Sequence, residues 1–159
     1  MRTPASIAGH PIHPMLVPIA IGGFILSFIF DIVCIATGST DPWATVAFYT
    51  MIGGIVGALA AAIFGFVDLV SLPEGRARHV GYAHMGLNLT IVALFLWSAW
   101  LRHEEVSGNL PFALSLIGIL LLTVSGWLGG KLVYEMGVGV SGEEVARGTT
   151  RPTRRHLEA

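Results

Sequence analysis

The sequence predicts an all-α, polytopic membrane protein whose four transmembrane helices form an antiparallel bundle. Of its 159 residues, 53% are hydrophobic and 12% are charged, whereas roughly a quarter of the residues of a soluble domain are charged. The mean hydropathy is +0.73, and four stretches reach the length of about 20 apolar residues that a helix needs to cross a bilayer. These observations exclude an ordinary water-soluble enzyme and a disordered chain.

The charge balance and the cysteine content exclude further classes of protein. Lys and Arg together number 9, and Asp and Glu number 10, so no basic field favours nucleic acid as a partner. Cys34 is the single cysteine, which excludes an internal disulfide and every zinc or iron–sulfur site built from several cysteines. Membrane lipid is therefore the expected partner.

The four predicted spans cover about residues 15–37, 43–69, 80–101 and 110–134. Three of them begin beside a proline (Pro14, Pro42 and Pro111), which suits the first turn of a helix because the missing N–H has no partner there. The spans end at Gly38, at the turn 73–75, at the polar cluster 102–105 and at Gly137. The connections are short, so consecutive helices are expected to be antiparallel neighbours.

The basic residues predict the orientation of the bundle. With four spans, the amino terminus, the connection between the second and third spans, and the tail share one side. That side carries eight basic residues against Arg102 alone on the other: Arg2, Arg76, Arg78, Lys131, Arg147, Arg151, Arg154 and Arg155. The asymmetry predicts that the strap (residues 1–14) and the flexible tail (residues 138–159) of this membrane protein are cytoplasmic.

Small residues in the second span predict how the helices pack. Gly53, Gly57, Ala61 and Gly65 follow one another at four-residue spacing, and Gly54, Ala58 and Ala62 lie beside them in the same ridge. In lipid, close approach through such a ridge holds helices together. The pattern predicts packing within the bundle, and a homodimer through the same ridge stays open.

Polar residues gather at the predicted cytoplasmic end. His10 and His13 stand just before the first span, His84 lies near the start of the third, and Asp68 ends the second. Ionisable residues at this depth are costly to desolvate, so they are candidates for a functional site.

The strap contains Gly9-His-Pro-Ile-His-Pro14, in which each histidine precedes a proline. A following proline disfavours the α region, so His10 and His13 are expected on an extended segment. Two interpretations stay open. The strap folds over the mouth of the bundle and presents an imidazole inward, or its histidines only cover the helix end.

His84 differs because it lies about four residues, roughly 6 Å, inside the third span. Asn88 follows at i+4 and shares its face. We expect this pair to face the interior, where His84 is a ligand, part of a proton relay, or a hydrogen-bonded structural residue.

Three chemistries suit these residues. Two imidazoles from separate elements suit the axial positions of a b-type haem enclosed by a bundle. Two or three imidazoles with Asp68 suit a zinc, iron or copper ion, and Asp68 with His84 suits proton relay near neutral pH. Four aromatic residues lie near enough in height to line a haem, although aromatic residues in membrane spans more often contact the core or lipid: Phe64, Phe66, Tyr82 and Trp127.

Two other features receive structural interpretations. Asp31 lies near the outer end of the first span, where Arg102 or His103 is expected to pair with it. Residues 137–142 read G-x-G-x-x-G, but they follow a membrane helix and precede no βαβ unit. A dinucleotide site is therefore rejected.

The end motifs resemble those of a known family. Gly9-His-Pro-Ile-His-Pro-Met-Leu-Val-Pro18, Ser125-Gly-Trp-Leu-Gly-Gly-Lys-Leu-Val-Tyr134 and Gly137-Val-Gly-Val140 resemble the DUF2231 family of small four-span bacterial membrane proteins, over roughly residues 6–142. Similar members are joined to Rieske iron–sulfur or c-type cytochrome domains, so the resemblance implies a redox setting. It favours haem and extends ligand candidacy to His10, His13 and His84.

The resulting hypothesis is a b-type haem protein that carries electrons to a redox partner protein or a quinone and transforms no substrate. One strap histidine (His13 first, then His10) and His84 are the expected ligands near the cytoplasmic face, and Asp68 and Asn88 are expected to orient them. The alternatives are a structural or accessory subunit whose polar residues satisfy helix ends, a metal site at His13 and His84 without haem, and a small-ion carrier.

Overall fold

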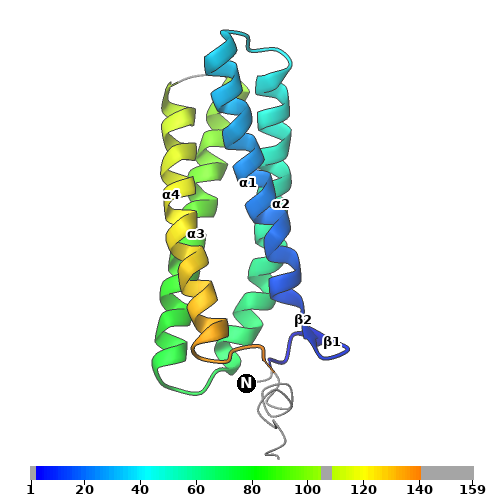
Figure 1. Cartoon of the computed structure of the whole chain (residues 1–159), viewed down its shortest axis with the longest axis vertical. Helices are drawn as coiled ribbons and strands as arrows, with labels where there is room; N and C mark the ends of the chain where they lie inside the picture. Colours follow the sequence, from blue (N-terminus) through cyan, green and yellow to red (C-terminus); the bar gives the residue numbers. More distant parts are fainter. Residues whose placement is uncertain (1–2, 105–108, 141–159) are drawn as a thin grey trace, which may run out of the picture.

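The computed structural model describes residues 3–104 and 109–140, and it confirms the predicted four-helix bundle (Figure 1). The helices are α1 (Ile12–Thr37), α2 (Trp43–Ser71), α3 (Arg76–Glu104) and α4 (Asn109–Tyr134). All four are long and apolar enough to cross a membrane. The predicted tail, residues 138–159, lies outside the described residues from 141 onward.

Helix α1 begins three residues earlier than predicted, so the expectation of an extended His13 is wrong. The N–H of Ile12 donates to the carbonyl of Ala5 at 2.9 Å, which gives one free donor of the first turn an acceptor. Pro14 is tolerated because its missing N–H would have had no partner inside the helix. His13 therefore lies in the first helical turn.

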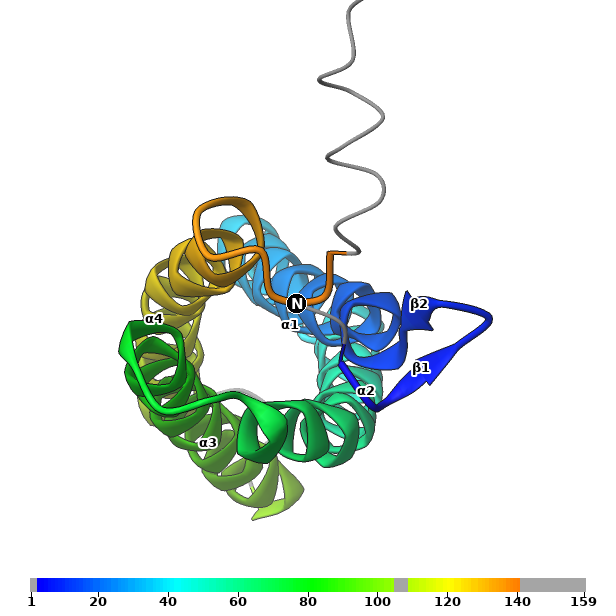
Figure 2. The same ribbon diagram turned by 90° about the horizontal axis from the view of Figure 1, so that it is seen from below.

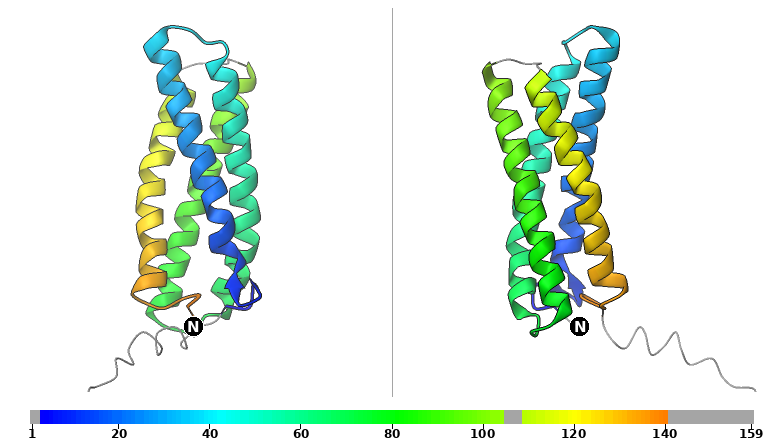
Figure 3. Two further views of the ribbon diagram at one scale, coloured as in Figure 1. Left: turned by 45° about the vertical axis from the view of Figure 1, so that its right-hand side comes forward. Right: turned by 90° about the vertical axis from the view of Figure 1, so that its left-hand side faces the viewer.

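The strap forms a small hairpin of β1 (Ser6–Ile7) and β2 (His10–Pro11), which are antiparallel. Its turn residues Ala8 and Gly9 have φ of 51° and 82°, the left-handed geometry that a tight hairpin turn requires. The hairpin projects sideways from the bundle (Figure 2). It marks one end, here called the strap end, which also carries the α2–α3 connection and the end of α4 (Figure 3).

The bundle consists of two helix pairs. Helix α1 packs mainly on α2 and α3 mainly on α4, whereas contacts between the pairs are fewer. The α1–α2 contact confirms the predicted ridge in part: a Cβ at Gly57 would lie 2.8 Å from Ile19, and one at Gly54 would lie 2.8 Å from Phe24. A Cβ at Gly53 would meet no atom within 4 Å. Gly54 therefore contacts α1, and Gly53 does not.

Three contacts along the α1–α3 diagonal connect the pairs. Phe24 and Phe95 stack at mid-height with ring centroids 4.0 Å apart, inside a core that Met51, Ile55 and Ile91 share. A histidine pair lies below this core, at the strap end, and an ion pair lies above it. The interior is therefore apolar at its centre and polar at both ends.

The two helix pairs are also internal repeats. Residues of α1 recur 71 positions later in α3: His13, Phe24 and Ser27 match His84, Phe95 and Ser98. Residues of α2 recur 64 positions later in α4: Phe48, Gly54, Ile55 and Gly65 match Phe112, Gly118, Ile119 and Gly129.

Packing repeats along with the sequence. A Cβ at Gly54 would lie 2.8 Å from the ring of Phe24, and one at Gly118 would lie 2.7 Å from the ring of Phe95. Helices α1 and α3 thus occupy equivalent corners of the ring of helices in Figure 2. The diagonal contacts join residues that are equivalent in the two repeats.

Candidate functional site

The candidate site is a pair of imidazoles at the strap end. His13 of α1 and His84 of α3 approach each other across the bundle, with ring centroids 6.4 Å apart and ring planes at 89°. Both residues are partly buried. The structure therefore brings together the two histidines that sequence analysis ranked first.

His13 is held by helix α2. Its Nδ1 donates to the carbonyl oxygen of Ala61 at 2.8 Å. A carbonyl only accepts, so Nδ1 carries the hydrogen and the neutral ring keeps a lone pair on Nε2. That nitrogen has no hydrogen-bond partner among the described residues.

His84 is held in the same way by helix α4. Its Nδ1 lies 2.9 Å from the carbonyl oxygen of Ser125 and 3.0 Å from the hydroxyl of the same residue. The amide nitrogen of Asn88 donates to Nε2 at 3.0 Å. Both ring nitrogens of His84 are thus hydrogen-bonded.

A glycine makes room for each imidazole. A Cβ at Gly65 would lie 2.7 Å from Nδ1 of His13, and a Cβ at Gly129 would lie 3.2 Å from Cε1 of His84. Gly65 and Gly129 are equivalent in the repeats, as are Ala61 and Ser125. One local design, a histidine resting on a glycine and bonded to a helix carbonyl, therefore occurs twice.

The other predicted site residues lie elsewhere at the strap end. His10 is exposed in β2, where its Nδ1 donates to the carbonyl of Ala8 at 3.1 Å. Asp68 is buried and accepts a hydrogen bond from the N–H of Ala5 at 2.9 Å. It holds the strap, whereas the sequence had suggested contact with the histidines.

Two observations concern the surroundings of the pair. Among residues 3–104 and 109–140, no group of three or more His, Cys, Asp or Glu side chains is placed to hold a metal ion. Three of the four aromatic residues at the height of a haem are on the outside, where aromatic residues of membrane spans often lie: Phe66 is 54%, Tyr82 is 42% and Trp127 is 67% exposed. Their sequence position gave the height but not the direction of the side chain.

Ser125, Gly65 and Gly129 belong to the site but were not among the predicted site residues. A serine or glycine inside a membrane helix is ordinary by itself. The internal repeat is the signal that would have found them, because it sets Ala61 and Gly65 beside Ser125 and Gly129.

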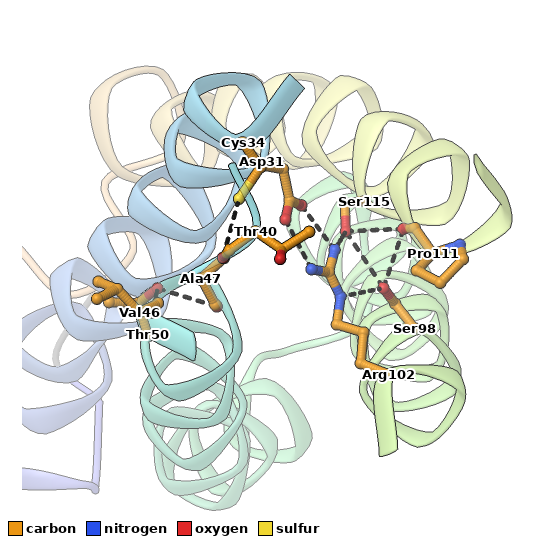
Figure 4. A network of polar contacts seen from close by, with 10 residues as sticks. All are labelled: Asp31, Cys34, Thr40, Val46, Ala47, Thr50, Ser98, Arg102, Pro111 and Ser115. Atoms are coloured by element: carbon orange, nitrogen blue, oxygen red, sulfur yellow. Dashed lines mark hydrogen bonds and ion pairs between the residues drawn. The ribbon is translucent and has the colours of Figure 1, made fainter. Parts of the chain in front are cut away.

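The opposite end contains the predicted partner of Asp31 (Figure 4). Arg102 donates from Nη1 and Nη2 to the two carboxylate oxygens of Asp31, both at 2.6 Å. Its Nε and Nη2 also lie 3.3 Å from the hydroxyls of Ser98 and Ser115, respectively. A cavity of about 190 Å³ adjoins the pair and is lined in part by Cys34.

The ion pair is buried and bidentate. The side chains of Arg102 and Asp31 are 3% and 8% exposed. Four of the five N–H groups of the guanidinium are used by Asp31, Ser98 and Ser115. This arrangement is that of a structural bridge, as the sequence had suggested.

Comparison with known proteins agrees with this architecture. The family model described as a predicted membrane protein (DUF2231) matches residues 9–142. No curated protein and no solved structure matches the chain. The matched range covers all four helices and both histidines of the site, and the chain therefore belongs to the DUF2231 family of predicted membrane proteins.

Proposed function

We propose that this membrane protein binds a b-type haem at the strap end, with His13 and His84 as axial ligands, and that it carries electrons. The observation that carries the proposal is the separation of the two imidazoles, 6.4 Å between ring centroids. A metal about 2.0–2.1 Å from one nitrogen of each ring would separate the ring centres by about 6.3 Å.

The position of the pair suits a flat ligand. His13 belongs to the α1–α2 pair and His84 to the α3–α4 pair, and contacts between the pairs are fewer than contacts within them. His13 and His84 would hold such a ligand from opposite helix pairs. Bound haem would supply a one-electron redox centre.

The hydrogen bonds of Nδ1 prepare both rings as ligands. In metal sites, a ligating histidine usually donates its other ring N–H to a carbonyl or carboxylate, which fixes the tautomer. His13 and His84 do this with the carbonyls of Ala61 and Ser125. Ligation by His84 through Nε2 requires that Asn88 release this nitrogen.

The same proposal places the strap end in the cytoplasm of a bacterial inner membrane. Arg76, Arg78 and Lys131 lie toward that end, whereas Arg102 at the opposite end is neutralised by Asp31. This distribution agrees with the positive-inside rule. The electron partner is then a separate protein or a quinone.

The test is a reduced-minus-oxidised visible spectrum of the detergent-purified protein from haem-supplied cells, with iron analysis of the same sample. We expect sharp Soret and α bands that His13→Ala and His84→Ala each abolish. His10→Ala and His79→Ala are matched controls and should keep them, because both histidines are exposed, one on the strap hairpin and the other at the start of α3.

Two outcomes would contradict the haem assignment. Retention of the full spectrum by His84→Ala would remove this residue as a ligand. A colourless protein with bound zinc or copper would instead indicate a two-histidine metal site.

A structural or accessory subunit is the second candidate. The complete hydrogen bonding around His84 favours it. His84, Asn88 and Ser125 satisfy one another through hydrogen bonds of 2.9–3.0 Å. This function predicts a colourless, metal-free protein in which His84→Ala lowers stability.

A further inference from the structure

His13 and His84 have equivalent positions in the two repeats, but their Nε2 atoms differ in hydrogen bonding. In the repeats, Val17 corresponds to Asn88 and Ala61 corresponds to Ser125. The first repeat thus offers the free nitrogen of His13 no polar neighbour at the position one turn along the helix. The second repeat offers the equivalent nitrogen of His84 an amide donor at 3.0 Å.

Ser125 determines which way the amide of Asn88 points. Its hydroxyl donates to Oδ1 of Asn88 at 3.0 Å, which turns the NH₂ group toward His84. The same hydroxyl oxygen lies 3.0 Å from Nδ1 of His84, so it shares the Nδ1 hydrogen with the carbonyl oxygen of Ser125. The three side chains form a closed ring of hydrogen bonds in which each donor has its acceptor.

We propose that Asn88, oriented by Ser125, is a blocking residue that covers the metal-binding nitrogen of His84 and sets the order of ligation. His13 binds an incoming metal-centred ligand first, and His84 follows once the amide has turned away. This inference rests on the proposed function. It also reverses the expected role of Asn88, because an orienting partner would strengthen ligation, whereas a blocking residue weakens it.

The repeat supplies the substitutions that test the proposal. Asn88→Val and Ser125→Ala each introduce the residue that the first repeat carries at the same position. Haem is titrated into the purified apoprotein in detergent. Asn88→Val is expected to tighten binding about two- to tenfold, the equivalent of one neutral hydrogen bond, and to speed formation of the six-coordinate, low-spin spectrum.

Ser125→Ala is expected to have a smaller effect in the same direction, because the amide loses its orientation but stays in place. The proposal is overturned if Asn88→Val binds haem more weakly than the wild type or stops at a five-coordinate, high-spin spectrum. Either result would make Asn88 an orienting residue and leave the haem assignment standing.

A second measurement needs no haem. Diethyl pyrocarbonate acylates an imidazole nitrogen that has a free lone pair, and mass spectrometry assigns the modified residue. Asn88→Val should raise the modification rate of His84 severalfold and leave that of His13 unchanged. If no variant binds haem, the proposed function fails, and an unchanged rate at His84 would then reject the blocking role as well.

Discussion

At each end of the bundle, one residue of α1 meets the equivalent residue of α3, but the two pairs are of different kinds. At the strap end both repeats carry a histidine, His13 and His84, whereas at the other end they carry opposite charges, Asp31 and Arg102. Opposite charges satisfy each other, here through two bonds of 2.6 Å. The two imidazoles take their partners from neighbouring helices, and Nε2 of His13 has no hydrogen-bond partner in the part of the chain that the structure describes.

This difference is the one expected if one end is a structural bridge and the strap end is a ligand site, as proposed above. A bridge needs complementary residues, so the two repeats must diverge at that position. A ligand that binds between the repeats can take the same donor from each. Like residues alone do not indicate a ligand, because Phe24 and Phe95 are also alike and stack on each other.

Breaking the ion pair should have the largest effect. Arg102→Met leaves the carboxylate of Asp31 buried without its partner, and loss of one member of a buried pair costs about 3–5 kcal/mol. We expect this loss in the free energy of unfolding, measured by titration with SDS in mixed micelles.

The exchanged pair, Asp31→Arg with Arg102→Asp, is the matched control. Ser27 lies four residues before Asp31, as Ser98 lies before Arg102, and its hydroxyl is buried without a partner in the described structure. The hydroxyl of Ser27 can therefore accept a hydrogen bond from a guanidinium at position 31. The exchange should restore most of the stability, and an exchange as unstable as Arg102→Met would show that the positions are not equivalent.

Substitution of the glycines that make room for the two histidines should lower the stability less. Gly65→Ala brings a Cβ to 2.7 Å from His13, and Gly129→Ala brings one to 3.2 Å from His84. Overpacking of this kind costs about 1–3 kcal/mol, with the larger effect expected at Gly65. Gly53→Ala and Gly126→Ala are the controls, because both face open space. If the control substitutions lower the free energy of unfolding as much as Gly65→Ala and Gly129→Ala do, contact with the histidines is not the cause of the loss.

The sequence predicted the elements that depend on composition and helical spacing. Apolar length gave the four helices, the i+4 spacing placed Asn88 beside His84, and shared depth paired Asp31 with Arg102. The sequence did not reveal that Asp68 holds the strap, because its partner is a backbone N–H that any residue carries. It also misplaced His13, since a proline in the first helical turn looks the same as one that ends an extended segment.

The smallest effect is expected at the strap itself. Asp68→Ala removes the acceptor of the Ala5 N–H, and the carbonyl of Ala5 in turn accepts from Ile12 at the start of α1. Without this hydrogen bond, the first turn of α1 should open locally while the rest of the bundle stays intact. The free energy of global unfolding should therefore change by about 1 kcal/mol or less. Hydrogen exchange of the Ile12 amide should rise, and exchange in α3 around His84 should not.

Glu74→Ala is the control for the strap, because this exposed carboxylate lies on the α2–α3 connection at the same end. Faster exchange around both His13 and His84 would mean that the strap supports the whole site. Faster exchange at Ile12 alone would show that His13 lies in the part of the bundle that opens locally and that His84 lies in the part that stays closed. That asymmetry is the one expected if His13 binds first and the ring of hydrogen bonds around His84 opens only afterwards.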